Sequence, residues 1–265
     1  MNNRLPEVLT PTSESYIFQV NQQLPNFLSA FYIVGSIALD EFNPHFSDVD
    51  FVAVTNHLAT DGEIEVLRQT HQEVEQHYSR WKLSGMYLLQ NDLGKSKEEI
   101  GTRLVFHDGN LKLQTNFDAS PVTWWILKNG GIPVLGIDPR KLPIAIDESY
   151  LVAWMLENMN TYWKSWTQRP SKLIILLIDW GIQWTVLGVA RQFYTIREKR
   201  FITKQRSGEY ALSVVPQKWH RILKEAIRLR AKSAGSLYRS RIVRMLDAVN
   251  FMKFIIKSSN EMEFL

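Results

Sequence analysis

The sequence contains no cysteine among its 265 residues. Disulfide bonds and thiolate metal sites are therefore excluded. Low-complexity segments and internal repeats are also missing, and a composition of 45% hydrophobic and 22% charged residues is that of an ordinary globular chain. The first residues carry no basic region followed by an apolar run, so no signal peptide is expected. Together these features favour a cytoplasmic protein.

A membrane span is the one hydrophobic feature that has to be considered. Residues 173–190 are very apolar and approach the length of a transmembrane helix. Asp179 and Gln183 interrupt this run, and Lys172 and Arg191 bracket it. Because a charged side chain in the middle of a span is costly in lipid, we predict a buried helix and no membrane association.

Hydrophobic periodicity predicts an α+β protein with two domains. Short β-rich runs and amphipathic helical runs alternate up to a proline-rich stretch at 133–143, after which only helical periodicity remains. We therefore predict a domain at 1–147 with a mixed sheet and helices, an all-helical domain at 148–265, and a ligand cleft between them. Strands are expected at 31–34, 49–54, 83–89, 104–106, 111–117 and 132–135, and helices at 61–81, 121–128, 150–166, 171–195, 206–214, 218–233 and 235–256.

The formal net charge is +4, and lysine and arginine are dense between Arg191 and Arg244. Such a segment is either a solvated helical surface or a wall that faces an anion, which could be a nucleotide phosphate or a nucleic acid. Composition alone leaves both interpretations open.

The strongest chemical signal combines a glycine-serine turn with a pair of aspartates. Gly35 and Ser36 close one β-rich run, and Asp48 and Asp50 open the next. Residues two apart in a strand share a face, so the two carboxylates should point the same way. Oxygen ligands of this kind suit Mg²⁺, which commonly takes one or two carboxylates together with waters and substrate phosphates. The pattern predicts a metal-assisted nucleotide site.

These residues also carry a resemblance to a known family. The stretches YIVGSIALDEFNPHFSDVDFVAV, SPVTWWILKNGGIPVLG and WTVLGVARQFYTIREKRFITKQRSGEYAL resemble the DNA polymerase β-like nucleotidyltransferases, and in particular the streptomycin/spectinomycin type of aminoglycoside adenylyltransferase. The resemblance implies that Asp48 and Asp50 bind the metal. It implies further nucleotide-binding roles for Gly35, Ser36, Ser47, Arg191 and Lys204, the last two being basic residues that reach the phosphates.

One position departs from the pattern of the family. Where the drug-modifying enzymes carry a glutamate as general base, this sequence has Ser84. A serine hydroxyl cannot accept the proton at neutral pH without a base of its own. Asp118, His107 and Glu157 are candidate replacements, and each could equally be an ordinary turn, hairpin or helix-surface residue.

The resemblance implies transfer of AMP from ATP, with Mg²⁺, to a hydroxyl of a small molecule such as an aminoglycoside, which would connect the protein to antibiotic resistance. We expect a monomer that does not act on nucleic acid. Two alternatives stay open: a nucleotide-binding protein with little or no transferase activity, and a transferase that acts on RNA or protein. Acidic and aromatic residues could line an acceptor pocket or belong to the core: Glu148, Glu157, Asp179, Trp154, Trp163, Trp166, Trp180 and Trp184.

Overall fold

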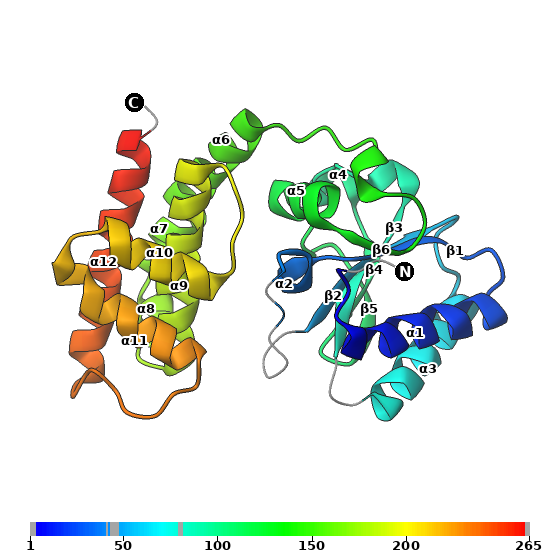
Figure 1. Cartoon of the computed structure of the whole chain (residues 1–265), viewed down its shortest axis with the longest axis horizontal. Helices are drawn as coiled ribbons and strands as arrows, with labels where there is room; N and C mark the ends of the chain where they lie inside the picture. The colour runs from blue at the N-terminus through cyan, green and yellow to red at the C-terminus, as the bar shows by residue number, and fades with distance from the viewer. Residues whose placement is uncertain (1–3, 41, 43–47, 79–81, 263–265) are drawn as a thin grey trace. The chain divides into compact units, whose positions relative to one another are not determined.

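The computed structural model describes residues 4–40, 42, 48–78 and 82–262. Of Met262 it describes only the backbone. The chain forms two compact units, Met1–Ile146 and Asp147–Leu265. The first unit contains all of the strands drawn in Figure 1, and the second is helical. The predicted α+β class is confirmed.

A mixed sheet organises the first unit. The strand order is β5-β4-β3-β2-β1-β6; β2 and β3 run parallel, and every other neighbouring pair is antiparallel (Figure 1). The strands are β1 (Leu28–Ile33), β2 (Val49–Thr55), β3 (Leu83–Leu89), β4 (Arg103–His107), β5 (Asn110–Gln114) and β6 (Ile132–Leu135).

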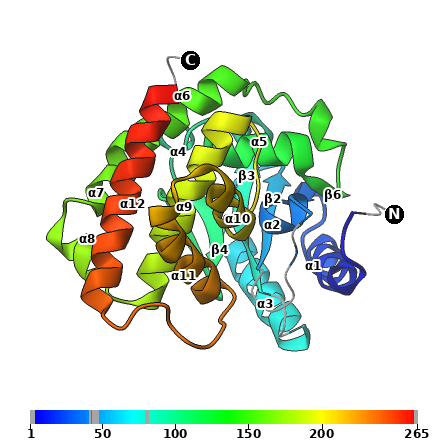
Figure 2. The same cartoon turned by 60° about the vertical axis from the view of Figure 1, so that its left-hand side comes forward.

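One face of this sheet carries the hydrophobic core. Helices α1 (Thr10–Gln23) and α3 (Asp61–His77) lie side by side in both views (Figures 1 and 2) and bury their apolar residues there. The core cluster on this face takes alternate residues of the central strands, because successive side chains of a strand point to opposite faces: Val49, Phe51, Ala53, Leu83, Tyr87, Leu104 and Phe106. The residues between them, Asp50 and Ser84 included, therefore belong to the opposite face.

Local sequence signals explain several boundaries in this unit. A capping box of Thr60 and Glu63 starts α3, which ends at His77 rather than at the predicted residue 81; residues 79–81 lie outside the described part of the chain. The strands predicted at 104–106 and 111–117 correspond to β4 and β5, which form a hairpin with Asp108 and Gly109 at positive φ in its turn. The shorter elements are η1 (Glu7–Leu9), α2 (Gly35–Ala38), η2 (Gln90–Asp92), α4 (Lys97–Ile100), α5 (Pro121–Gly130) and η3 (Pro139–Lys141).

The second unit is built around α9, which packs against α10, α11 and α12. Within the described ranges its regular elements are all helices, and the first of them runs through a π-helical stretch, η4, into α7. The helices are α6 (Glu148–Asn158), η4 (Met159–Trp163), α7 (Lys164–Trp166), α8 (Pro170–Ile175), α9 (Asp179–Glu198), α10 (Lys204–Val214), η5 (Gln217–Trp219), α11 (His220–Arg230) and α12 (Arg241–Met262).

The single helix predicted over 171–195 is wrong, because the chain breaks between α8 and α9. Asp179 begins α9 instead of lying in the middle of a helix. Arg244 stabilises the break, since it donates hydrogen bonds to the Leu177 carbonyl oxygen at 3.2 Å and to Asp179 at 2.7 Å. No helix in the described ranges is long and apolar enough to cross a membrane.

The last helix also begins later than periodicity predicts, at Arg241 rather than at residue 235. The loop before this helix is hydrogen-bonded to α11. The Ser236 hydroxyl and the Leu237 N–H both donate hydrogen bonds to Glu225 of α11. These contacts replace the helical hydrogen bonds that the segment would otherwise make.

Candidate functional site

Asp50 and Gly35 form the centre of the candidate site in the first unit. Asp50 lies on β2, and Gly35 begins α2 directly after β1, the neighbour of β2. Gly35 has a φ of +65°, and a Cβ atom built on it would fall 2.0 Å from Oδ2 of Asp50. Only glycine tolerates both this backbone angle and so close an approach. The glycine-serine turn and the acidic strand predicted from the sequence therefore meet in space.

The electrostatics around Asp50 fit a bound cation. Burial, together with the nearby carboxylates of Asp48 and Asp118, raises the pKa of Asp50 to about 7. Like charges held this close repel each other, and a divalent cation would relieve that repulsion. Across the described ranges, no group of three or more potential ligands is arranged as a complete metal site. The protein thus offers a carboxylate pair of the kind that Mg²⁺ shares with phosphates and waters.

Of the two serines expected to contact phosphate, the structure describes only one. Ser36 lies in α2, next to Gly35. Ser47, the serine before the acidic pair, lies outside the described residues.

Ser84 lies beside Asp50 and has a histidine partner. The two residues are directly paired across β2 and β3. Ser84 Oγ lies 3.0 Å from Nδ1 of His107, and Nε2 of that histidine lies 3.4 Å from Oδ2 of Asp108. Of the three candidate bases, the structure therefore brings His107 to Ser84 and Asp118 close to Asp50. Glu157 is an exposed residue of α6 in the other unit.

Lys204 lies in an unusual setting in the second unit. Its Nζ atom sits 3.6 Å from the centroid of the Trp184 ring. Burial, together with the positive charges of Arg191 and Arg230, lowers the pKa of Lys204 to about 6. The family resemblance indicated Arg191 and Lys204 but not Arg230, because only the packing of α11 against α9 and α10 brings its charge near.

Several basic residues of the same segment serve the fold instead. Arg228 and Arg244 bind Glu225, and Arg221 donates hydrogen bonds to the Leu237 carbonyl oxygen. The cationic stretch is therefore neither a uniform solvated surface nor a uniform anion-binding wall.

Some of the aromatic residues considered for an acceptor pocket belong to the core, and others are exposed. Trp163 and Trp166 are buried in the core. Trp180 is 49% exposed and stacks on Trp184 with ring centroids 5.3 Å apart. Among the acidic candidates, Asp179 pairs with Arg244.

Comparisons with known proteins agree with this organisation. The model of the nucleotidyltransferase domain matches residues 16–107, and the model of the C-terminal domain of aminoglycoside adenylyltransferase matches residues 157–253. No curated protein matches the sequence.

Among solved structures, the chain is similar to spectinomycin adenyltransferase AAD(9) from Enterococcus faecialis, determined with ATP and spectinomycin. The TM-score is 0.66 at 15% identity, and the similarity covers 91% of this chain and 98% of the other. At that identity the structural likeness supports the fold, and the two domain models support the family. The first unit therefore contains a nucleotidyltransferase domain, the second contains a domain like the C-terminal domain of aminoglycoside adenylyltransferases, and the whole chain resembles one such enzyme in fold.

Proposed function

We propose that this protein is a metal-dependent adenylyltransferase that moves AMP from ATP to a hydroxyl group of a small molecule of the aminoglycoside kind. The observation that carries the proposal is the meeting of Gly35 with the Asp48/Asp50 pair, where the backbone approaches the carboxylate too closely for any side chain. The nucleotidyltransferase family and the likeness to an enzyme solved with ATP and spectinomycin support the choice of nucleotide and acceptor.

Each site residue has a physical role in this proposal. Asp48 and Asp50 would hold Mg²⁺, which neutralises phosphate charge and orients attack at the α-phosphorus. The backbone at Gly35, together with Ser36 and Ser47, would contact phosphate oxygens. Arg191 and Lys204 would bind the phosphates from the helical unit.

Calorimetric titration with ATP, with and without Mg²⁺, tests the proposal. We expect Mg²⁺-dependent binding that the Asp48→Asn/Asp50→Asn variant loses by about tenfold or more, which is about 1.4 kcal/mol or more of binding free energy. The variant should keep its far-ultraviolet circular dichroism, because asparagine has nearly the shape of aspartate. Equal ATP affinity in both proteins would refute the assignment. Pyrophosphate release with spectinomycin then tests the acceptor.

A second prediction concerns the proton balance of nucleotide binding. With a pKa of about 6, Lys204 is mostly neutral above neutral pH in the free protein. Contact with a triphosphate favours the charged ammonium and raises that pKa. Binding of ATP at mildly alkaline pH should therefore take up about one proton, and the affinity should fall as the pH rises.

Titrations in buffers of different ionisation enthalpy measure this proton uptake. Lys204→Met should bind ATP more weakly and take up no proton. Lys257→Met is the matched control, since Lys257 is an exposed lysine of α12 that pairs with Glu261. Uptake that persists in Lys204→Met would assign the proton to another group.

One observation favours a second candidate function, a nucleotide-binding protein with little transferase activity. Ser84, paired directly with Asp50, offers a hydroxyl where a carboxylate would be a base in its own right. Tight Mg²⁺-dependent ATP binding without pyrophosphate release to any acceptor would favour this alternative.

A further inference from the structure

Three polar residues form a row across neighbouring strands of the first unit. Asp50 of β2 is paired with Ser84 of β3. Gly85 is paired with Phe106 of β4, so His107 is the next position opposite Ser84. Because alternate residues of these strands fill the core, the three polar side chains share the other face of the sheet, at the same end of their strands.

The imidazole of His107 is placed to act as a base for the Ser84 hydroxyl. A carboxylate 3.4 Å from Nε2, that of Asp108, favours the imidazole tautomer with its proton on Nε2. Nδ1 then has a lone pair that accepts the Ser84 hydroxyl proton across 3.0 Å. In this arrangement the lone pairs of Ser84 Oγ can accept a proton from a further hydroxyl group.

Asp118 is a weaker choice for the proton acceptor. It lies close enough to Asp50 to raise the pKa of that carboxyl, and it accepts a hydrogen bond from Ser120. A cation held by the acidic pair would stabilise the charged form of Asp118 and so lower its basicity. His107 lies one strand further from the pair, and its side chain is 62% exposed, so it can pass a proton on to water.

We propose that Ser84 and His107 form a proton relay for the acceptor hydroxyl, an inference that rests on the proposed adenylyl transfer. As the acceptor oxygen bonds to the α-phosphorus, its O–H bond breaks and the proton moves to Ser84 Oγ. The original Ser84 proton moves to Nδ1 of His107. The bond from the α-phosphorus to its bridging oxygen breaks, and pyrophosphate leaves with that electron pair. The imidazolium then faces Asp108 and releases its proton to solvent.

Pyrophosphate release by the full-length protein tests the relay, with Mg²⁺-ATP and either spectinomycin or water as the acceptor. His107→Gln and Ser84→Ala should each lower kcat by roughly a hundredfold or more, the usual effect of losing a general base. The Kd for ATP should not change. The double variant should be no slower than either single variant, because both residues serve one relay.

Two further variants separate a relay from a merely structural contact. His57→Gln is the matched control, because His57 is a half-exposed histidine that pairs with Glu63 beyond the far end of β2. Ser84→Glu/His107→Gln should regain activity, because a carboxylate at position 84 needs no histidine partner.

A His107→Gln variant that keeps the wild-type kcat would overturn the relay and leave the proposed function intact. A wild-type protein that does not bind Mg²⁺-ATP would overturn the proposed function itself, and the relay with it. Binding without pyrophosphate release to spectinomycin or to water would overturn the relay and the transferase activity together. Circular dichroism of each variant excludes misfolding as the cause of a loss.

Discussion

Replacing Glu225 with alanine should lower the free energy of unfolding of the helical unit by about 3–5 kcal/mol, the usual cost of removing one partner from a buried ion pair. Glu225 is fully buried on α11, and Arg244 of α12 is only 3% exposed. The guanidinium of Arg244 lies 3.3 Å from the Glu225 carboxylate. Without the glutamate, Arg244 keeps its positive charge in the interior, and its remaining ion-pair partner among the described residues is the exposed Asp179.

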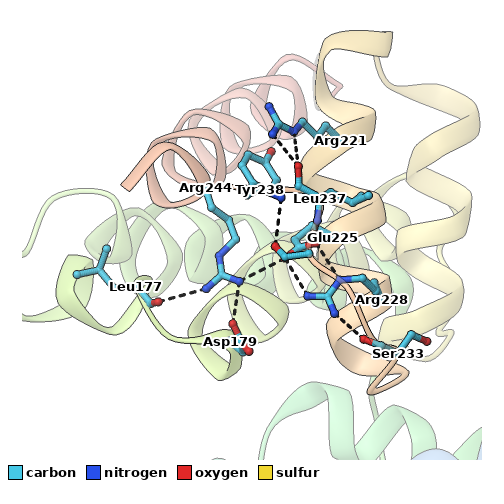
Figure 3. Close-up of polar contacts among 10 residues, drawn as sticks. Leu177, Asp179, Arg221, Glu225, Arg228, Ser233, Leu237, Tyr238 and Arg244 are labelled. Atoms are coloured by element: carbon cyan, nitrogen blue, oxygen red, sulfur yellow. Dashed lines mark hydrogen bonds and ion pairs between the residues drawn. The ribbon is translucent and has the colours of Figure 1, made fainter. Parts of the chain in front are cut away.

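The same carboxylate joins segments that are distant in the sequence (Figure 3). It accepts hydrogen bonds from Arg228, from the Ser236 hydroxyl and from the Leu237 N–H. Arg244 extends the network to Asp179 and to the Leu177 carbonyl oxygen, at the break between α8 and α9. The loss should therefore affect the packing of α11, α12 and the start of α9 together.

Urea unfolding followed by circular dichroism measures this effect. Glu261→Ala is the control, since Glu261 is an exposed residue whose pairing with Lys257 one turn away should contribute only about 0.3–0.5 kcal/mol. A change of less than about half a kcal/mol in Glu225→Ala would contradict the prediction.

The pH dependence gives an independent check on the network. Burial alone would raise the pKa of Glu225, but the hydrogen bonds from Arg228, the Leu237 N–H and Ser236 outweigh it and lower the pKa from 4.5 to about 2. Because the folded pKa is depressed, this stabilisation is present above about pH 4.5 and is lost as the pH falls toward 2. The difference in unfolding free energy between the wild type and Glu225→Gln should narrow over that interval.

Replacing Gly35 with alanine should abolish Mg²⁺-dependent ATP binding. A φ of +65° strains any residue with a side chain, at a cost of about 1–3 kcal/mol. The added Cβ would also fall 2.0 Å from Oδ2 of Asp50, so the carboxylate or the turn must move. Displacement of a metal ligand at the proposed site should reduce ATP affinity far more than it reduces stability. Calorimetry and thermal unfolding on the same variant measure the two effects.

Two other glycines separate the contributions of strain and contact. Gly101 has a φ of +76°, and a Cβ there would meet nothing within 4 Å, so Gly101→Ala should reduce stability without weakening ATP binding. Gly62, in the first turn of α3, also has open space and no positive φ. Gly62→Ala should be neutral or stabilising by up to about 1 kcal/mol. ATP affinity in Gly35→Ala equal to that of Gly101→Ala would show that contact with Asp50 is unimportant.

Much of the fold could be predicted from the sequence because the signals that define single elements are local. Short apolar, β-rich runs predicted β2 and β3, and the Asp108-Gly109 turn signal marks the hairpin between β4 and β5. The capping box of Thr60 marks the start of α3. The glycine-serine turn and the aspartate pair could be found for the same reason, since each is a short motif whose chemistry depends on its immediate neighbours.

Features that depend on contacts between distant segments follow only from the folded chain. Arg244 donates hydrogen bonds to Asp179 and to the Leu177 carbonyl oxygen, 65 and 67 positions away, at the break between α8 and α9, and helical periodicity cannot register such contacts. The pairing of β3 with β4 in the sheet places His107 beside Ser84. The packing of α10 on α9 brings Lys204 over the Trp184 ring. Local sequence signals could predict most of the elements and the residues proposed for the chemistry. Packing decided where helices stop and which polar groups become partners. The free energy of a buried charge or hydroxyl depends on the hydrogen-bond and ion-pair partners that lie next to it in the folded chain.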